Sequence, residues 1–237
     1  MEERNPFIRA RRRAGRVKRW VKRRLYERTI GRQYRAWLAQ APAIEAGSVD
    51  NAVPIAVIVP VFNPPVHFLA ECLGSVLAQS ARNWQLIVSD DGSTAPGVTA
   101  WLDAFTAEHA GDPRVIVLRN ANGGISAACN RGLERVTTKF FGWLDHDDRL
   151  DPRCFAAFSE RISAVASEVD IVYSDEDKID TKGAHFELFC KPDYSPELLL
   201  TQMYLCHFTV FRTALVRAAG GFRSAMDGAQ DFDLALR

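Results

Sequence analysis

The stretch Phe140-Phe141-Gly142-Trp143-Leu144-Asp145-His146-Asp147-Asp148 passes from an apolar, aromatic run directly into a group of three carboxylates. Such a run predicts a buried strand, so the acids stand at its carboxyl end, where open α/β sheets bind their ligands. Carboxylates this close repel one another unless a cation or a proton lies between them. Oxygen ligands suit Mg²⁺ or Mn²⁺, which usually hold phosphates as well. The stretch therefore indicates a metal–diphosphate site, and the alternative is an acidic surface loop.

Around this stretch, residues 54–237 are expected to form one α/β domain, preceded by an Ala-rich linker at residues 41–53. Apolar runs that predict buried strands alternate with helical periods, at residues 55–59, 84–88, 114–118 and 140–144. This order implies a mostly parallel sheet with helices on both faces. Right-handed crossovers then bring the strand ends to one rim. That rim is expected to carry Asn63, Asp90, Asp91, Asp145 and Asp147.

A glycine pair lies on the same predicted rim. Asn122-Gly123-Gly124 opens a predicted helix, whose main-chain N–H groups favour an anion, although a plain turn is the alternative. The first strand is not followed by Gly-x-Gly-x-x-Gly, and the chain has no Gly-x-x-x-x-Gly-Lys-Ser/Thr. A dinucleotide fold and a P-loop are therefore disfavoured.

Charge is segregated along the chain, although the net charge of the 237 residues is only +1. Residues 1–40 hold 14 Lys and Arg against 3 Asp and Glu, and the remainder holds 16 against 26. Apolar residues recur at helical spacing from Val17 to Leu25 opposite a basic face, which predicts a helical arm. Such an arm suits an anionic membrane surface. A solvated tail or a partner contact is the alternative, and nucleic acid is not expected.

The cysteines and the N-terminus indicate the cellular compartment in which the protein is expected. The five cysteines are scattered without a Cys-x-x-Cys pair, which supports neither a zinc site nor a disulfide framework. Free cysteines fit a reducing cytosol best. The basic N-terminus lacks the apolar region of a secretory signal, and no stretch reaches the ~18 apolar residues of a membrane span. We expect a cytoplasmic protein, peripheral at the inner face of the plasma membrane if the arm binds there.

Motifs in fixed order over roughly residues 34–237 resemble those of family 2 glycosyltransferases with the GT-A fold. The resemblance is closest to the bacterial branch found in O-antigen and other surface-polysaccharide assembly. The matching segments are VIVPVFN at 57–63, SDDGST at 89–94, NGGISAACN at 122–130, LDHDD at 144–148, YSDEDKID at 173–180, KPDYSP at 191–196, GGF at 220–222 and GAQDFDL at 228–234.

This resemblance implies a Rossmann-like nucleotide-binding half joined to an acceptor half. It implies a metal-dependent, inverting transferase of the hexosyl or deoxyhexosyl class, with Mn²⁺ or Mg²⁺ as cofactor. The donor is expected to be a nucleotide-diphosphate sugar and the acceptor a glycan or a lipid-linked glycan. The nucleotide-binding residues that it implies are Pro60, Phe62, Asn63, Asp91, Gly124 and Asp145.

The resemblance also implies two further roles. Asp145 and Asp147 match an Asp-x-Asp metal signature, with Asp147 as the direct ligand and Asp145 as the supporting acid. Asp231 matches the family's catalytic base, and Gln230 stands before it where many members carry Glu.

The remaining polar residues are given lesser roles. Asp233 is expected to act as support, His146 and Asp148 as bystanders, and His207 as a core or rim histidine with satisfied hydrogen bonds. Lys191 could reach a phosphate. Residues 175–177 either orient the donor or acceptor or are simply solvated.

Two other function classes stay open. A sugar nucleotidyltransferase also uses an α/β sheet and a metal, but it needs a Gly-rich, basic loop after the first strand, where this chain has Asn63-Pro64-Pro65. A non-catalytic sugar-nucleotide-binding module is the second alternative. The chain ends six residues after Asp231, whereas relatives usually continue. We therefore expect either a fragment or an incomplete catalyst that relies on a partner.

Overall fold

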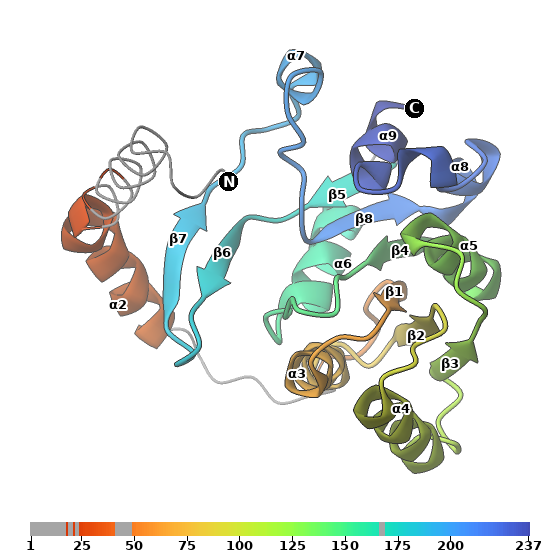
Figure 1. The fold of residues 1–237 in the computed structure, drawn as a ribbon. Helices are drawn as coiled ribbons and strands as arrows, with labels where there is room; N and C mark the ends of the chain where they lie inside the picture. Colours follow the sequence, from red (N-terminus) through yellow and green to blue (C-terminus); the bar gives the residue numbers. More distant parts are fainter. Residues whose placement is uncertain (1–17, 19–20, 22–23, 41–48, 166–168) are drawn as a thin grey trace, which may run out of the picture. The chain divides into compact units, whose positions relative to one another are not determined.

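The computed structural model describes residues 18, 21, 24–40, 49–165 and 169–237 (Figure 1). Residues 1–17, 19–20 and 22–23 of the expected arm and residues 41–48 of the expected linker lie outside the described residues. The chain divides into two compact units. The first unit joins Met1–Ala43 to Asp175–Cys190, and the second joins Ile44–Ser174 to Lys191–Arg237.

The second unit is built on a six-stranded sheet with the strand order β3-β2-β1-β4-β8-β5. Strands β1 to β4 are mutually parallel, and β8 runs antiparallel to both of its neighbours, β4 and β5. The predicted mostly parallel sheet is therefore confirmed. The strands are β1 (Ile55–Val61), β2 (Trp84–Asp90), β3 (Val115–Arg119), β4 (Phe140–Trp143), β5 (Ile171–Tyr173) and β8 (Thr209–Arg212).

Helices connect these strands and cover the sheet (Figure 1). Proline begins α4 and α7, where its missing N–H costs nothing because a helix's first N–H groups have no partner within the helix. The helical elements of the second unit are α3 (Val66–Leu77), α4 (Pro96–Glu108), α5 (Ile125–Arg135), α6 (Cys154–Ala164), α7 (Pro196–Leu199), α8 (Thr213–Ala218), the 3-10 helix η3 (Ser224–Met226) and α9 (Gln230–Leu236).

Both faces of β1 are covered, and all seven of its residues are buried. Because successive side chains of a strand point to opposite faces, β1 contributes to two apolar clusters. Val57 and Val59 belong to one cluster, with residues of α3, α4 and α6. Ala56 and Ile58 belong to the other, with residues of α5, α8 and α9. Each fully buried Val or Ile contributes about 1.5–3 kcal/mol, so the continuous apolar run holds β1 at the centre of the sheet.

The first unit contains the arm and a two-stranded sheet. The described arm is helical, with a π-helical turn η2 (Glu27–Gly31) followed by α2 (Arg32–Gln40). Strands β6 (Glu176–Ile179) and β7 (His185–Phe189) pair antiparallel. The Tyr34 hydroxyl donates to Asp177 Oδ2 at 2.6 Å, and Tyr26 Oη accepts the Leu188 N–H at 2.7 Å. Asp177 also meets His185 Nδ1 at 2.6 Å, so this carboxylate links the arm to the hairpin.

Candidate active site

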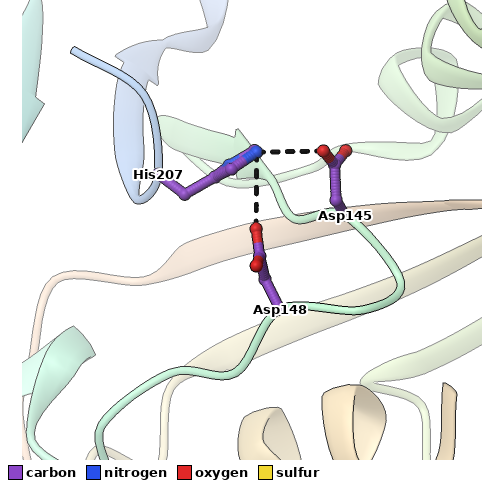
Figure 2. A group of neighbouring side chains, drawn as sticks. All are labelled: Asp145, Asp148 and His207. Carbon is purple, nitrogen blue, oxygen red and sulfur yellow. Dashed lines mark hydrogen bonds and ion pairs between the residues drawn. The ribbon is translucent and has the colours of Figure 1, made fainter. Parts of the chain in front are cut away.

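The acids of the Phe140–Asp148 stretch meet a histidine from a distant part of the chain. Asp145 and Asp148 follow β4, and His207 precedes β8 (Figure 2). His207 Nε2 lies 3.1 Å from Asp145 Oδ2 and 3.6 Å from Asp148 Oδ2. One ligand atom from each of these three half-buried residues lies within 4.8 Å of the others, a spacing that could hold a metal ion. We call these three residues the β4 cluster.

Antiparallel pairing of β4 with β8 brings the cluster together. Gly142 pairs with Val210, so the carboxyl end of β4 meets the segment that enters β8. A Cβ atom on Gly142 would stand 2.5 Å from the Thr209 carbonyl oxygen and 2.7 Å from the Phe208 ring. Only glycine permits this close approach of the two segments, which places His207 beside the acids.

The charge state of the cluster follows from its neighbours. Burial opposes ionisation of Asp145, but the hydrogen bond from His207 and the charges of His207 and His146 outweigh it, so the pKa of Asp145 lies below its usual value. The Cys72 thiol donates a hydrogen bond to the main-chain carbonyl oxygen of Asp145 at 3.4 Å. Burial, followed by the nearby acids, raises the pKa of Cys72, so this cysteine stays a neutral thiol.

The composition of the β4 cluster differs from the one expected from the motif. Asp145 is a member, as expected, but Asp147 is exposed and lies outside the cluster. Asp148 and His207, expected to be a bystander and a core or rim residue, are the other two members. The role of Asp147 as a direct metal ligand stays a prediction. No local signal in the sequence could have paired His207 with Asp145, because only the β4–β8 register joins them.

Asp91 is enclosed by hydrogen-bond donors. Its carboxylate accepts from Gly123 N at 2.9 Å, Gly124 N at 2.8 Å and Arg131 Nη1 at 3.1 Å, and the residue is only 3% exposed. Gly124 has φ +88°, a conformation that glycine adopts without strain. The N–H groups expected to face an anion therefore face Asp91, which stabilises the N-terminus of α5. Nucleotide binding by Asp91 and Gly124 stays a prediction.

Asn63 lies two residues after the end of β1 and holds the neighbouring loop. Its Oδ1 accepts the N–H groups of Thr94 and Ala95, both at 2.8 Å, and its own N–H donates to Ser93 Oγ at 2.9 Å. Of the other two residues of the expected nucleotide wall, Pro60 is buried within β1 and Phe62 is half exposed. Phe62 is therefore the member of this wall whose apolar surface is open to a ligand.

The expected base lies on α9. Asp231 is half-buried in the first turn, and Gln230 before it accepts the Gly228 N–H at 2.8 Å. Asp233 is bound by Arg223 and Arg237. The hydrogen bond from Arg223, with help from Arg237, lowers the pKa of Asp233. The structure thus places Asp233 in two ion pairs, and its supporting role in the reaction stays a prediction.

Hydrogen bonds fasten α5 to the segment that leads into α9. Asn130 donates through Nδ2 to the Phe222 carbonyl oxygen at 2.8 Å, and its Oδ1 accepts the Phe222 N–H at 2.8 Å. Asp227 Oδ1 accepts the Ser126 N–H at 3.2 Å. The helix that begins beside Asp91 is thus tied to the region that presents Asp231.

Comparison with known proteins identifies the family of this arrangement. The family model described as "Glycosyl transferase family 2" matches residues 56–219. The chain is 42% identical over 190 residues to the uncharacterized protein y4gI of Sinorhizobium fredii, covering 80% of this chain and 20% of that protein. It is 34% identical over 211 residues to the O-antigen biosynthesis protein RfbC of Myxococcus xanthus, covering 86% of this chain and 16% of that protein. The chain thus spans a fifth or less of these two relatives.

A solved structure shows the same fold. Residues 1–349 of Staphylococcus aureus TarS in complex with UDP match with a TM-score of 0.61 and 19% identity, covering 76% of this chain and 53% of that one. The mixed sheet flanked by helices is that of GT-A glycosyltransferases. Because the family model matches residues 56–219, the chain belongs to glycosyl transferase family 2.

Proposed function

We propose that this chain moves a sugar from a nucleotide-diphosphate sugar to a glycan or lipid-linked acceptor in the biosynthesis of a surface polysaccharide. The observation that carries the proposal is the β4 cluster at the carboxyl end of a parallel strand, in a chain of this family. The name of the O-antigen relative supports a role in surface-polysaccharide biosynthesis. The UDP bound to TarS supports a nucleotide-containing donor.

A divalent cation, Mn²⁺ or Mg²⁺, is the proposed cofactor. The residues at the end of β4 fit such an ion, because carboxylate oxygens suit both metals and imidazole is also a ligand for transition metals. Asp145 would hold it with Asp147, as the motif implies, or with Asp148 and His207 of the β4 cluster. When bound, the ion neutralises charge on the leaving diphosphate.

The residues of the chain supply the other parts of the reaction. Asp231 accepts the proton of the acceptor hydroxyl as that oxygen attacks the anomeric carbon. Attack on the face opposite the diphosphate inverts the anomeric centre. Phe62 offers apolar surface to the nucleotide, and Pro60, Asn63, Asp91 and Gly124 shape the rim around it.

Thermal shift against UDP-, GDP- and dTDP-sugars, with and without Mn²⁺, tests the proposal. A ligand that binds the folded state raises the melting temperature by mass action. We expect one donor to raise it more with Mn²⁺ than without, and we expect Asp145→Asn to lose that metal-dependent part. Asp50→Asn, a change to an exposed carboxylate, is the matched control. No shift with any donor would contradict the proposal.

Turnover separates the catalyst from a binding module. We expect Asp231→Asn to keep the donor-dependent melting shift and to lose about 10²–10⁴-fold in sugar transfer or donor hydrolysis. Donor binding by the parent protein without either reaction would favour the non-catalytic module. Formation of a sugar nucleotide from a nucleoside triphosphate and a sugar phosphate would favour the nucleotidyltransferase.

The arm is proposed to hold the protein at the inner face of the plasma membrane, as a cytoplasmic peripheral protein. Exposed Leu25 (60%) and Trp37 (59%) accompany the basic residues Lys18, Arg28 and Arg32, a composition that suits an anionic surface. Among the helices that the structure describes, none has the length and apolar character to cross a membrane. Co-flotation with phosphatidylglycerol vesicles but not with phosphatidylcholine vesicles is expected, and Leu25→Ser with Trp37→Ser should abolish it. Equal flotation of this double variant would contradict the role of the arm.

A further inference from the structure

The segment that carries His207 lies between α7 and β8 and has no ladder of main-chain hydrogen bonds along residues 203–207. Its carbonyl groups are bound by side chains instead. Thr209 Oγ1 donates to the carbonyl oxygens of Leu205 at 3.2 Å and Cys206 at 2.8 Å. Cys206 has a positive φ of 41°, so the path of this segment depends on such side-chain contacts.

Lys191 binds both ends of residues 205–207, which we call the His207 turn. Its half-buried ammonium donates to the Leu205 carbonyl oxygen at 2.5 Å and to the His207 carbonyl oxygen at 2.9 Å. One cation thus binds the residue directly before Cys206 and the residue directly after it. Hydrogen bonds from a charged donor are stronger than those between neutral groups, so Lys191 restricts the main chain of His207 itself.

The surroundings of Lys191 hold it in place. Ser195 N, four residues on, donates to the Tyr204 hydroxyl at 2.9 Å, and the Tyr173 hydroxyl donates to the Pro192 carbonyl oxygen at 2.7 Å. Tyr204 and Leu205 are themselves buried. The segment from Lys191 to Ser195 therefore forms a fixed support against which the His207 turn is held.

We propose that Lys191 is a positioning residue for the metal-binding group, acting through the main chain of His207 to hold the imidazole at Asp145 and Asp148. This inference rests on the proposed function, because it assigns the β4 cluster to a divalent cation. Partners that orient a metal ligand commonly affect metal affinity as much as activity. Lys191 would then act on cation binding and not by contact with the donor's phosphates.

Binding of Mn²⁺ alone to the full chain, measured by electron paramagnetic resonance of the free ion, tests this role. Lys191→Met is expected to weaken Mn²⁺ binding about 10-fold or more. Lys191→Arg, which keeps a cationic donor, should stay closer to the parent. Lys182→Met makes the same chemical change at an exposed position and should leave affinity unchanged. Once His207→Ala has removed the imidazole, adding Lys191→Met should cause little further loss.

Amide hydrogen exchange of the metal-free protein provides a second readout. Residues 203–209 should exchange faster in Lys191→Met than in the parent and in Lys182→Met. Unchanged Mn²⁺ affinity or unchanged exchange in Lys191→Met would overturn the inference. So would weaker binding of UDP in the absence of metal with Mn²⁺ affinity intact, because Lys191 would then contact the phosphates. If the parent itself binds no Mn²⁺, the cofactor proposal fails, and exchange still decides whether Lys191 fixes the turn.

Discussion

The parallel strands β1–β4 and the C-terminal residues 191–237 achieve order in different ways. β1 pairs with β2 over seven residues and is buried along its whole length. In residues 191–237, β8 has only four residues, and side chains bind the main chain at isolated points. Lys191 binds carbonyl groups at 205 and 207, and Arg237 binds those of Ala219 and Gly221.

This difference shows which substitutions should matter in each region. Apolar burial is shared among many residues, so the parallel half tolerates change at most exposed polar positions. A region held by single polar side chains depends on each of them. The β4 cluster lies where the two regions meet, and it takes its acids from the first and His207 from the second.

The largest expected effect breaks the comparison, because it falls on a polar residue of the parallel half. Asp91→Ala leaves Gly123 N, Gly124 N and Arg131 without their buried acceptor. We expect it to lower the free energy of unfolding by about 3–5 kcal/mol, as measured by urea denaturation. Asp103→Ala, at an exposed carboxylate on α4, should cost less than about 1 kcal/mol. Equal effects would show that Asp91 is not an anchor of the fold.

The next effect tests the junction between the two regions. Gly142→Ala places a Cβ against the Thr209 carbonyl oxygen and the Phe208 ring, and we expect a loss of about 2–3 kcal/mol in urea denaturation. Gly74→Ala, on α3, meets no atom within 4 Å and should gain up to about 1 kcal/mol. A Gly142→Ala protein as stable as the parent would mean that β4 and β8 approach less closely.

A smaller effect sharpens the comparison across α5. Asn130→Ala removes both hydrogen bonds to Phe222, whose main chain is buried, and we expect a loss of about 2 kcal/mol in the same measurement. Glu134→Ala lies exposed on the same helix and should change stability by no more than about 0.5 kcal/mol. If the two variants behave alike, α5 and residues 220–230 are not joined through Asn130.

The smallest expected effect concerns acid stability of the C-terminal region. The hydrogen bond from Arg223 lowers the pKa of Asp233 in the folded state. The charged carboxylate therefore stabilises the folded state at pH values above the unfolded-state pKa of about 3.9. This stabilisation is lost as the pH falls through the lower folded-state pKa. The melting temperature of Asp233→Asn should therefore fall less steeply below about pH 4. Asp193→Asn, at an exposed position, should keep the slope of the parent. An unchanged slope in Asp233→Asn would contradict this pairing.

Much of the sheet could be predicted from apolar periodicity. The runs at 84–88 and 114–118 became β2 (Trp84–Asp90) and β3 (Val115–Arg119), displaced by two residues or fewer at their ends. β2 lies inside a sheet covered on both faces, where an apolar run has no other stable place, and all of its residues are buried. β3 is the edge strand, and its apolar residues are half-buried. β8 was not predicted from the sequence, because its four residues are placed by pairing with β4 and β5.

In the candidate site, only the residues that directly follow a predicted strand could be placed from the sequence. Asp145 was expected at the end of β4, and it lies there. Asp148 was not expected in the cluster because the motif favoured Asp147, whereas a local turn, in which the Asp148 N–H donates to the Asp145 carbonyl oxygen, keeps Asp148 close to Asp145. His207 was not expected because its distance in the sequence carries no sign of the β4–β8 register. Asp91 was assigned from its motif alone, which does not reveal that Gly123 and Gly124 donate to its carboxylate.

The sequence by itself determined the family, the parallel direction of β1–β4 and the rim on which the acids were expected. Those features depend on local periodicity and on connections between neighbouring elements, which a linear pattern records. Only the tertiary structure decided which side chains share the β4 cluster and that Lys191 reaches the carbonyl groups beside Cys206. Hydrogen bonds act over about 3 Å, and whether residues distant in the chain come that close depends on the packing of the whole unit.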